Sequence, residues 1–180
     1  GIALYTYTNA EEVELKQNGK SLGTKNNSSK HKERNRIKWV NIEYKSGELA
    51  AIARNGGKEV ARHSLETTGE AVALKLIPDV QTWHADGKDL LHVRVIAVDK
   101  KGRRVLSAGE NHRFSVTGND EIVAVDNGNI SSDELAVGTE RSLFMGSALV
   151  ILRAGASASN IILEVASDKY KTQRIKLNTN

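Results

Sequence analysis

The chain has 180 residues, of which 39% are hydrophobic and 27% are charged, and it carries a net charge of +4. This composition is ordinary for a globular protein that buries a core, and no apolar run approaches the roughly 18 residues that a membrane-spanning helix needs. Because there is no cysteine, disulfides, thiolate metal sites and cysteine nucleophiles are excluded.

The first 67 residues have the pattern of short strands joined by tight turns. Large and small side chains alternate from Leu4 to Thr8, and Val13 and Leu15 later resume the alternation. Asn18-Gly19 predicts a hairpin, since a type I′ turn needs positive φ at both central residues. Further strands are expected at residues 20–23, 37–44, 49–53 and 60–65, with a turn at 55–57.

Residues 25–38 form a basic segment. Residues 1–67 hold 12 Lys and Arg against 8 Asp and Glu, whereas residues 68–180 hold 14 of each, so the net charge lies in the first part. Such a segment could bind phosphate groups. No aromatic residue is interleaved with the cations to stack on a base, so we interpret the segment as a solvated loop and expect no nucleic-acid partner.

The second part of the chain has the spacing of an immunoglobulin-like sandwich. Leu91, Val93 and Val95 point to one face of a strand while His92 and Arg94 point to the other. Residues 131–139 are expected to form a loop or a short helical turn. Seven strands separated by turns are expected, at residues 74–78, 91–97, 114–116, 122–125, 148–152, 161–165 and 173–177.

The segment Thr67-Thr68-Gly69-Glu70 separates the strand that ends at Leu65 from the pattern that begins at Ala71. We interpret it as the joint between a small β-sandwich, residues 1–67, and an immunoglobulin-like domain, residues 68–180. The expected fold class is therefore all-β, with two tandem immunoglobulin-like β-sandwich domains.

Several short segments, taken in order, resemble a known family. Residues 7–9, 12–15, 18–23 and 44–49 are similar to the small β domain that follows the catalytic barrel in bacterial β-galactosidases of glycoside hydrolase family 2. Residues 85–90, 114–118, 125–129 and 144–150 are similar to the terminal immunoglobulin-like domain of the same enzymes. The chain departs from the family pattern in its basic segment, which is longer than usual, and at Trp83-His84, where an aliphatic residue is more usual.

The resemblance implies that this chain is a non-catalytic C-terminal fragment of a β-galactosidase-like enzyme. Retaining glycosidases use two carboxylates about 5 to 5.5 Å apart. In this family both belong to a (β/α)8 barrel, and no alternating βα pattern is present here. The local acidic groups, Glu11, Glu12, Glu14 and Asp133-Glu134, are interpreted as surface residues, so we expect no catalytic residue and no cofactor.

Two sets of side chains raise the question of a metal. Asp126, Asn127, Asn129 and Asp133 offer oxygen ligands, but they lack the glycine and glutamate positions of an EF-hand loop, and a turn stabilised by its own side chains is favoured. A zinc site would need His63, His84 and His92 to meet across strands. None of the five histidines, which also include His31 and His112, has short metal-binding spacing, so no metal site is expected.

Sugar binding is the main alternative function, because carbohydrate-binding modules stack aromatic rings on sugar faces. Trp39 and Trp83 are the candidates for contact with a carbohydrate or a neighbouring domain. Trp39 is expected mainly in the core, whereas Trp83, beside His84 and a turn, is expected to be more exposed. A structural or adhesin-type tandem of immunoglobulin-like domains is a third possibility.

The resemblance also implies a cellular context. The expected partner is the catalytic barrel of the same parent chain, while a glycan ligand and a homo-oligomer of the parent enzyme stay open, and no membrane partner is expected. Enzymes of this kind are usually exported, which implies a periplasmic or extracellular location. Residues 1–5 show no secretion-signal pattern, which favours a piece cut from a longer chain.

Overall fold

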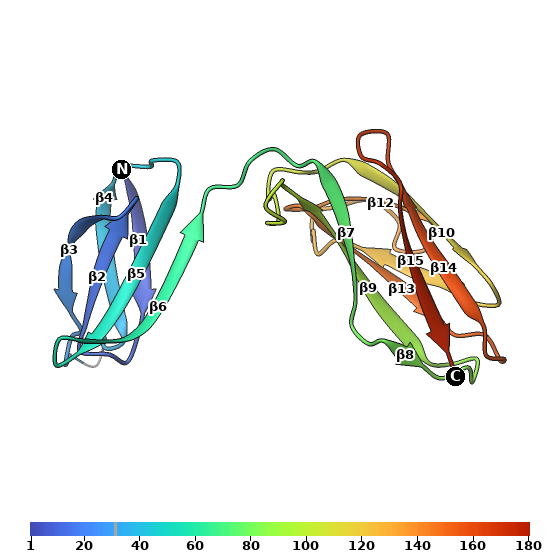
Figure 1. The fold of residues 1–180 in the computed structure, drawn as a ribbon, viewed down its shortest axis with the longest axis horizontal. Helices are drawn as coiled ribbons and strands as arrows, with labels where there is room; N and C mark the ends of the chain where they lie inside the picture. The colour runs from blue at the N-terminus through green and yellow to red at the C-terminus, as the bar shows by residue number, and fades with distance from the viewer. Residues whose placement is uncertain (31) are drawn as a thin grey trace. The chain divides into compact units, whose positions relative to one another are not determined.

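The computed structural model describes residues 1–30 and 32–180 and shows fifteen β-strands (Figure 1). The described residues contain no α-helix, so the prediction of an all-β fold is confirmed. They therefore also contain no helix that is long and apolar enough to cross a bilayer. The chain divides into two compact units, Gly1–Thr67 and Thr68–Asn180, and each is described by itself.

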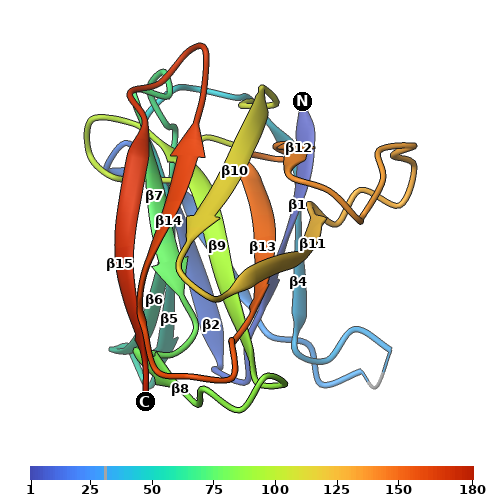
Figure 2. The ribbon, with the colours of Figure 1, turned by 90° about the vertical axis from the view of Figure 1, so that its right-hand side faces the viewer.

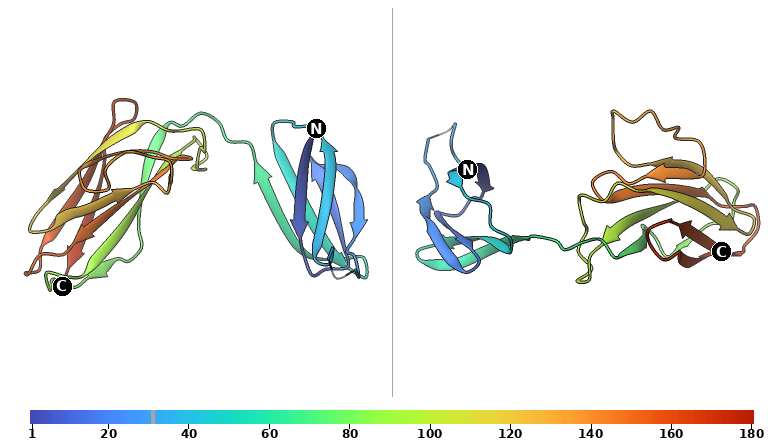
Figure 3. Two further views of the ribbon diagram at one scale, coloured as in Figure 1. Left: turned by 180° about the vertical axis from the view of Figure 1, so that it is seen from behind. Right: turned by 90° about the horizontal axis from the view of Figure 1, so that it is seen from above.

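Unit 1 is a small sandwich of two antiparallel sheets. One sheet has the order β1-β4 and the other the order β3-β2-β5-β6. Figure 3 shows β1 and β4 side by side, in agreement with their pairing. The strands are β1 (Ile2–Tyr7), β2 (Glu12–Gln17), β3 (Lys20–Asn26), β4 (Arg36–Ile42), β5 (Glu48–Asn55) and β6 (Lys58–Glu66).

The core of unit 1 follows from side-chain alternation. In β2, Val13 and Leu15 are buried while the intervening positions reach the surface, and in β4, Ile37 and Trp39 are buried in the same way. These four side chains pack together with Ala10 and Ala53. Burying one such aliphatic side chain contributes about 1.5 to 3 kcal/mol, so the alternation fixes which face of each strand turns inward.

The turns of unit 1 confirm the hairpin predictions. Asn18 and Gly19 have φ values of 50° and 79°, and Gln17 pairs with Lys20, which makes a two-residue turn between β2 and β3. Gly56 and Gly57, with φ values of 54° and 78°, join β5 to β6 in the same manner. Both turns have positive φ at their central positions, as type I′ geometry requires.

Unit 2 is a larger sandwich with sheets in the orders β12-β10-β14-β15-β8 and β11-β13-β9-β7 (Figure 2). All neighbouring strands are antiparallel except β15 and β8, which are parallel. The strands are β7 (Ala73–Pro78), β8 (Thr82–Trp83), β9 (Leu90–Val98), β10 (Asn111–Thr117), β11 (Glu121–Asp126), β12 (Glu140–Ser142), β13 (Ser147–Arg153), β14 (Asn160–Ala166) and β15 (Gln173–Thr179).

The core of unit 2 forms where apolar faces of the two sheets meet. Leu91 and Val93 of β9 lie opposite Leu152 and Val150 of β13, and all four side chains are fully buried. The other sheet contributes Ile161, Leu163 and Val165 of β14 to the same cluster. The predicted inward face of residues 91–97 is therefore confirmed.

The structure adds detail that the sequence pattern does not contain. Unit 2 has nine strands where seven are predicted, because β8 and β12 have only two and three residues. Residues 131–139 form turns and bends without a helix. The basic segment is not one loop, since Lys25 belongs to β3 while Arg36 and Lys38 belong to β4.

Candidate functional site

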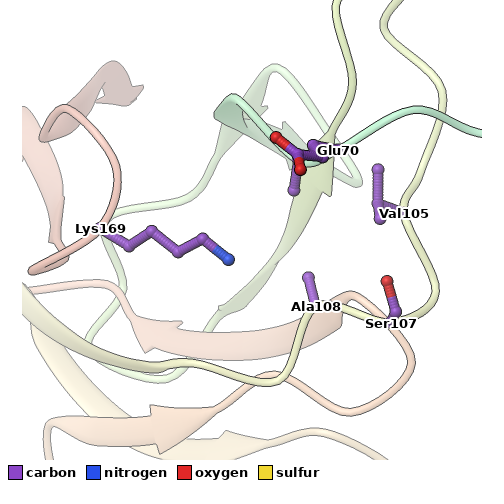
Figure 4. Close-up of a pocket in the computed structure, with 6 residues that line it drawn as sticks. Glu70, Val105, Ser107, Ala108 and Lys169 are labelled. Carbon is purple, nitrogen blue, oxygen red and sulfur yellow. The ribbon is translucent and has the colours of Figure 1, made fainter.

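One depression in the surface of unit 2 has a volume of about 260 Å³ (Figure 4). Its walls carry the carboxylate of Glu70 and the ammonium of Lys169, whose side chain extends into the depression. The rest of the lining comes from Ala71, Val105, Ser107 and Ala108. This lining offers one carboxylate, whereas glycoside hydrolysis by the usual route needs two.

The ammonium of Lys169 is paired with a carboxylate beside this depression. Glu110 forms an ion pair with Lys169 and accepts a hydrogen bond of 3.0 Å from the hydroxyl of Tyr170. Burial acts to raise the pKa of Glu110, but the hydrogen bonds from Lys169, from the backbone and from Tyr170 bring it below its ordinary value. Hydrogen bonding to Glu110 also raises the pKa of Lys169. Both groups therefore stay charged near neutral pH, which is the state of a structural ion pair.

A second feature is the loop between β11 and β12, residues 127–139, which we call the β11–β12 loop. Figures 2 and 3 show that it extends away from the two sheets of unit 2. At its base lies Arg141, whose side chain is only 4% exposed. Its guanidinium donates to the carbonyl oxygen of Glu134 at 2.8 Å, to Asp126 Oδ1 at 3.2 Å and to Asn127 Oδ1 at 3.2 Å. One buried cation thus joins both ends of the loop.

Glu134 completes this arrangement from within the β11–β12 loop. It accepts hydrogen bonds from the Ser142 backbone N–H at 2.8 Å and from the Ser132 hydroxyl at 3.0 Å. Burial acts to raise the pKa of Glu134, yet the hydrogen bonds from Ser142 and Ser132 and the charge of Arg141 give a net lowering. The carboxylate therefore stays ionised and stabilises the loop through these hydrogen bonds.

The outer surface of the β11–β12 loop is apolar. Ile130 is fully exposed, and Leu135 and Val137 are each 79% exposed. Three exposed large apolar side chains on one loop are candidates for contact with a partner. The loop is therefore the candidate functional site of unit 2.

The two tryptophan candidates lie in the cores. Trp39 and Trp83 are each 2% exposed. The indole of Trp39 donates to the Thr6 hydroxyl at 2.9 Å. The expectation that Trp83 is more exposed is corrected: β8 pairs with β15, which turns Thr82 outward and Trp83 into the core of unit 2. Neither indole presents a ring face to the solvent.

The side-chain oxygens of Asp126 and Asn127, considered above as metal ligands, accept hydrogen bonds within their own turn. Asp126 Oδ1 accepts the backbone N–H of Asn127 at 2.7 Å, and Asn127 Oδ1 accepts that of Asn129 at 2.9 Å. The same Asp126 and Asn127 oxygens also accept from Arg141. The favoured interpretation, a turn stabilised by its own side chains, agrees with this geometry.

The three histidines considered for a zinc site lie on or beside different strands. His63 belongs to unit 1, whereas His84 and His92 of unit 2 have separate partners, Asp89 at 3.4 Å and Asp79 at 3.2 Å. His31 lies outside the described residues. Within residues 1–30 and 32–180, no three His, Asp or Glu side chains are close enough to hold a metal ion.

The acidic residues at the start of β2 also have structural partners. Glu11 accepts the backbone N–H of Gly56 at 2.6 Å, which ties it to the β5–β6 turn. Glu14 accepts from Arg54 at 2.9 Å, and hydrogen bonds from Ser21 and Arg54 lower its pKa. Glu11 and Glu14 thus link the start of β2 to β5 and to the β5–β6 turn.

The sequence pattern alone does not point to the residues that define the β11–β12 loop as a site. Arg141 lies in a polar stretch and carries no sign of burial. Ile130, Leu135 and Val137 were available as a signal, because three large apolar residues in a segment without strand periodicity have no place in a core.

Comparison with known proteins assigns the family. Residues 74–176 match "Glycoside hydrolase family 2 C-terminal domain 5", and residues 1–61 match a domain of unknown function, DUF4982. A β-galactosidase of Bacteroides ovatus is 34% identical over 171 residues, which are 95% of this chain and 20% of that protein. A β-glucuronidase of Formosa agariphila is 32% identical over 117 residues, which are 64% of this chain and 12% of that protein.

A solved structure agrees with this assignment. A family 2 member from Bacteroides cellulosilyticus superposes with a TM-score of 0.95 and 33% identity, covering 99% of this chain and 23% of that one. The chain thus spans about a fifth of the length of its relatives. It belongs to glycoside hydrolase family 2 and consists of C-terminal domains of that family.

Proposed function

We propose that this chain is a non-catalytic C-terminal part of a β-galactosidase-like enzyme and supports its catalytic barrel by packing against it. The similarity to a β-galactosidase over 95% of the chain supports the kind of enzyme. The coverage of only 20% of that protein supports a role as one part of a larger molecule. The role itself rests on the β11–β12 loop.

The observation that carries the proposal is the combination of a buried cation and exposed apolar side chains in one loop. Arg141 and Glu134 stabilise the β11–β12 loop through contacts within the chain itself. A fixed loop loses little conformational entropy on binding, and exposed Ile130, Leu135 and Val137 gain from being covered. The occupant we propose is the part of the same enzyme that precedes this chain.

The non-catalytic character is supported by the state of the acidic groups. Glu110, Glu134 and Glu14 have pKa values below the ordinary range and are engaged in hydrogen bonds. A general acid at neutral pH needs the opposite, a raised pKa.

The location in the cell is a further part of the proposal. A periplasmic or extracellular enzyme would meet polysaccharide outside the cytoplasm, as expected for the kind of enzyme proposed. Fractionation of cells that make the full-length protein tests this, and recovery in the cytoplasmic fraction alone would refute it.

A chromogenic assay tests the absence of catalysis. The 180-residue chain should show no turnover of p-nitrophenyl β-galactoside above the rate in buffer, whereas the full-length enzyme should hydrolyse it. Turnover by the 180-residue chain would contradict the proposal.

Association in trans tests the docking role. The barrel-containing part, prepared without this chain, should bind the chain in calorimetry. The triple variant Ile130→Ser, Leu135→Ser, Val137→Ser should bind at least roughly tenfold more weakly, because three apolar contacts are lost. The matched control replaces Val80, Leu90 and Leu106, which are also exposed, by serine. Equal loss in both triple variants would show that the loop is not the docking surface.

A further inference from the structure

The outward face of the β1–β4 sheet in unit 1 brings aromatic and basic side chains together. In the antiparallel register, Tyr5 lies opposite Lys38 and Tyr7 lies opposite Arg36. Since side chains alternate along a strand, all four point to the same face, opposite to buried Ile37 and Trp39. Figure 3 shows these two strands side by side at one side of unit 1.

The two tyrosines form an exposed aromatic platform. Tyr7 is 74% exposed and Tyr5 is 45% exposed. Their ring centroids lie 6.4 Å apart with an interplanar angle of 29°. This exposed aromatic pair offers apolar ring surface to a ligand.

The cations lie over the ring of Tyr5. The Arg36 guanidinium lies 5.4 Å and the Lys38 ammonium 5.8 Å from the centre of the Tyr5 ring, both within cation–π range. Neither has a carboxylate partner among the described residues. Because neither cation is held in an ion pair within the described part of the chain, both are available to an anion.

An adjacent depression extends this surface. It has a volume of about 280 Å³ and is lined by Tyr5, Arg36 and Lys38 together with Lys25 and Glu33. Lys25 reaches across from β3, donates to the Lys38 carbonyl oxygen at 2.7 Å and lies 5.0 Å from the Trp39 ring centre. Glu33 is the one carboxylate in this lining, against three cations. The depression therefore keeps a positive charge.

We propose that this surface binds an anionic saccharide, with a sugar face stacked on Tyr7 and a carboxylate or sulfate group bound by Arg36 and Lys38. Arginine suits this role because its planar guanidinium can hold both oxygens of such a group. The choice of a saccharide rests on the proposed function, which places this chain in a carbohydrate-active enzyme. The surface is distinct from the β11–β12 loop, so the two proposals can fail separately.

The charge and the aromatic platform together define the ligand. A neutral saccharide would use the ring of Tyr7 but leave Arg36 and Lys38 unused. A single-stranded nucleic acid would also use both features, and it is the alternative that the experiment must separate.

Calorimetric titration of the 180-residue chain at low ionic strength tests the proposal. The probes are a galacturonic acid hexasaccharide, which carries carboxylates, a chondroitin sulfate hexasaccharide, which also carries sulfates, neutral cellohexaose and the DNA oligonucleotide dT12. At least one acidic saccharide should bind, cellohexaose should not, and added salt should weaken binding.

Variants then locate the site. Tyr7→Ala and the double variant Arg36→Gln, Lys38→Gln should each weaken binding by roughly tenfold or more, as expected when charge-assisted contacts or a stacked ring are lost. The controls change exposed residues elsewhere, Tyr44→Ala and the double variant Lys100→Gln, Lys171→Gln. Unchanged thermal unfolding would show that each variant is folded.

Four results would overturn the proposal. They are no binding of either acidic saccharide, equal binding of cellohexaose, tighter binding of dT12 than of both acidic saccharides, and loss of binding in the control variants to the same degree as in the site variants. None of them depends on catalysis or on docking through the β11–β12 loop.

Discussion

Arg141 and Glu134 are joined twice, once through side chains and once through the backbone. The Arg141 Nε lies 3.6 Å from Glu134 Oε2, and Arg141 Nη1 donates to the Glu134 carbonyl oxygen at 2.8 Å. The guanidinium is buried, while the Glu134 side chain is 29% exposed. A buried arginine so bound acts as an internal brace for the β11–β12 loop.

Replacement of Arg141 by leucine should destabilise unit 2 and loosen the loop. Breaking a buried ion pair costs about 3 to 5 kcal/mol, but the carboxylate partners here reach solvent, so we expect a loss of about 2 to 3 kcal/mol. Urea unfolding measures the loss, and limited proteolysis should reveal new cleavage within residues 127–139. The matched control is Arg113→Leu, which breaks an exposed pair with Asp168 and should cost about 1 kcal/mol or less. If Arg141→Leu and Arg113→Leu lower the free energy of unfolding equally, Arg141 does not stabilise the loop in the way proposed.

The hydrogen bonds of Asp99 lead us to expect that the fold loses stability in acid. Its carboxylate accepts the Gly69 backbone N–H at 3.0 Å and Arg103 Nη2 at 2.7 Å. The hydrogen bonds from Arg103, with those from backbone N–H groups, hold the pKa of Asp99 well below its usual range. A lowered pKa stabilises the fold above the unfolded value of about 4, and this contribution disappears as the pH falls below it.

The variant Asp99→Asn should therefore lower the urea midpoint at pH 7, and its difference from the original chain should shrink as the pH falls below about 4. Asp168→Asn, at a side chain that is 95% exposed, is the control and should leave the midpoint nearly unchanged. A difference for Asp99→Asn that stays constant with pH would show that the charge of Asp99 is not responsible.

Replacement of Gly146 by any residue with a side chain should destabilise unit 2. It has a φ of 73° in the two-residue turn between Phe144 and Ser147, and a Cβ at this position would lie 2.2 Å from the Val105 carbonyl oxygen. Gly102 has nearly the same φ, 76°, but open space around it. We expect Gly102→Ala to cost about 1 kcal/mol from backbone strain and Gly146→Ala to cost about 3 kcal/mol, because the clash with backbone adds to the strain. Thermal unfolding of the two variants separates strain from crowding, and equal losses would contradict the predicted clash.

The local features of this fold could be predicted from sequence because they depend on neighbours in the chain. The Asn18-Gly19 turn follows from the φ values that these residues tolerate. The inward face of Leu91, Val93 and Val95 follows from alternation alone. Both were confirmed.

The candidate sites could not be predicted because they depend on pairing between distant segments. Trp83 is buried by the parallel pairing of β8 with β15, at the far end of the chain. No aromatic residue is interleaved with the cations in the sequence, yet the β1–β4 register places Arg36 and Lys38 over the ring of Tyr5. In the sequence, Arg141 looks like any surface arginine, and only the folded chain shows that its side chain is buried.

His112 predicts a second pH-dependent effect, at a higher pH than that of Asp99. It is 1% exposed and lies parallel to the Tyr170 ring at a centroid distance of 5.9 Å. Its Nδ1 lies 2.8 Å from the Glu110 carbonyl oxygen, which can only accept, so Nδ1 carries the proton. The buried Nε2 has no partner among the described residues, and protonation there would bury an unpaired charge.

Burial accordingly lowers the pKa of His112, although hydrogen bonding to Glu110 acts in the opposite direction. An unfolded histidine takes up a proton near pH 6.5 while the folded one does not. Stability should therefore fall as the pH drops below about 6.5, by at most about 1.4 kcal/mol per pH unit from this group.

The variant His112→Phe should be less sensitive to this pH change. At pH 7 it loses one hydrogen bond to the Glu110 carbonyl, which costs about 1 kcal/mol. Between pH 7 and pH 5 its urea midpoint should fall less than that of the original chain, because no proton is taken up at this position on unfolding. His84→Phe changes an exposed histidine and should keep the original pH dependence. If the urea midpoints of His112→Phe and His84→Phe change with pH in the same way, the loss of stability in this range does not come from His112. The folded protein would then accept a proton on this buried imidazole.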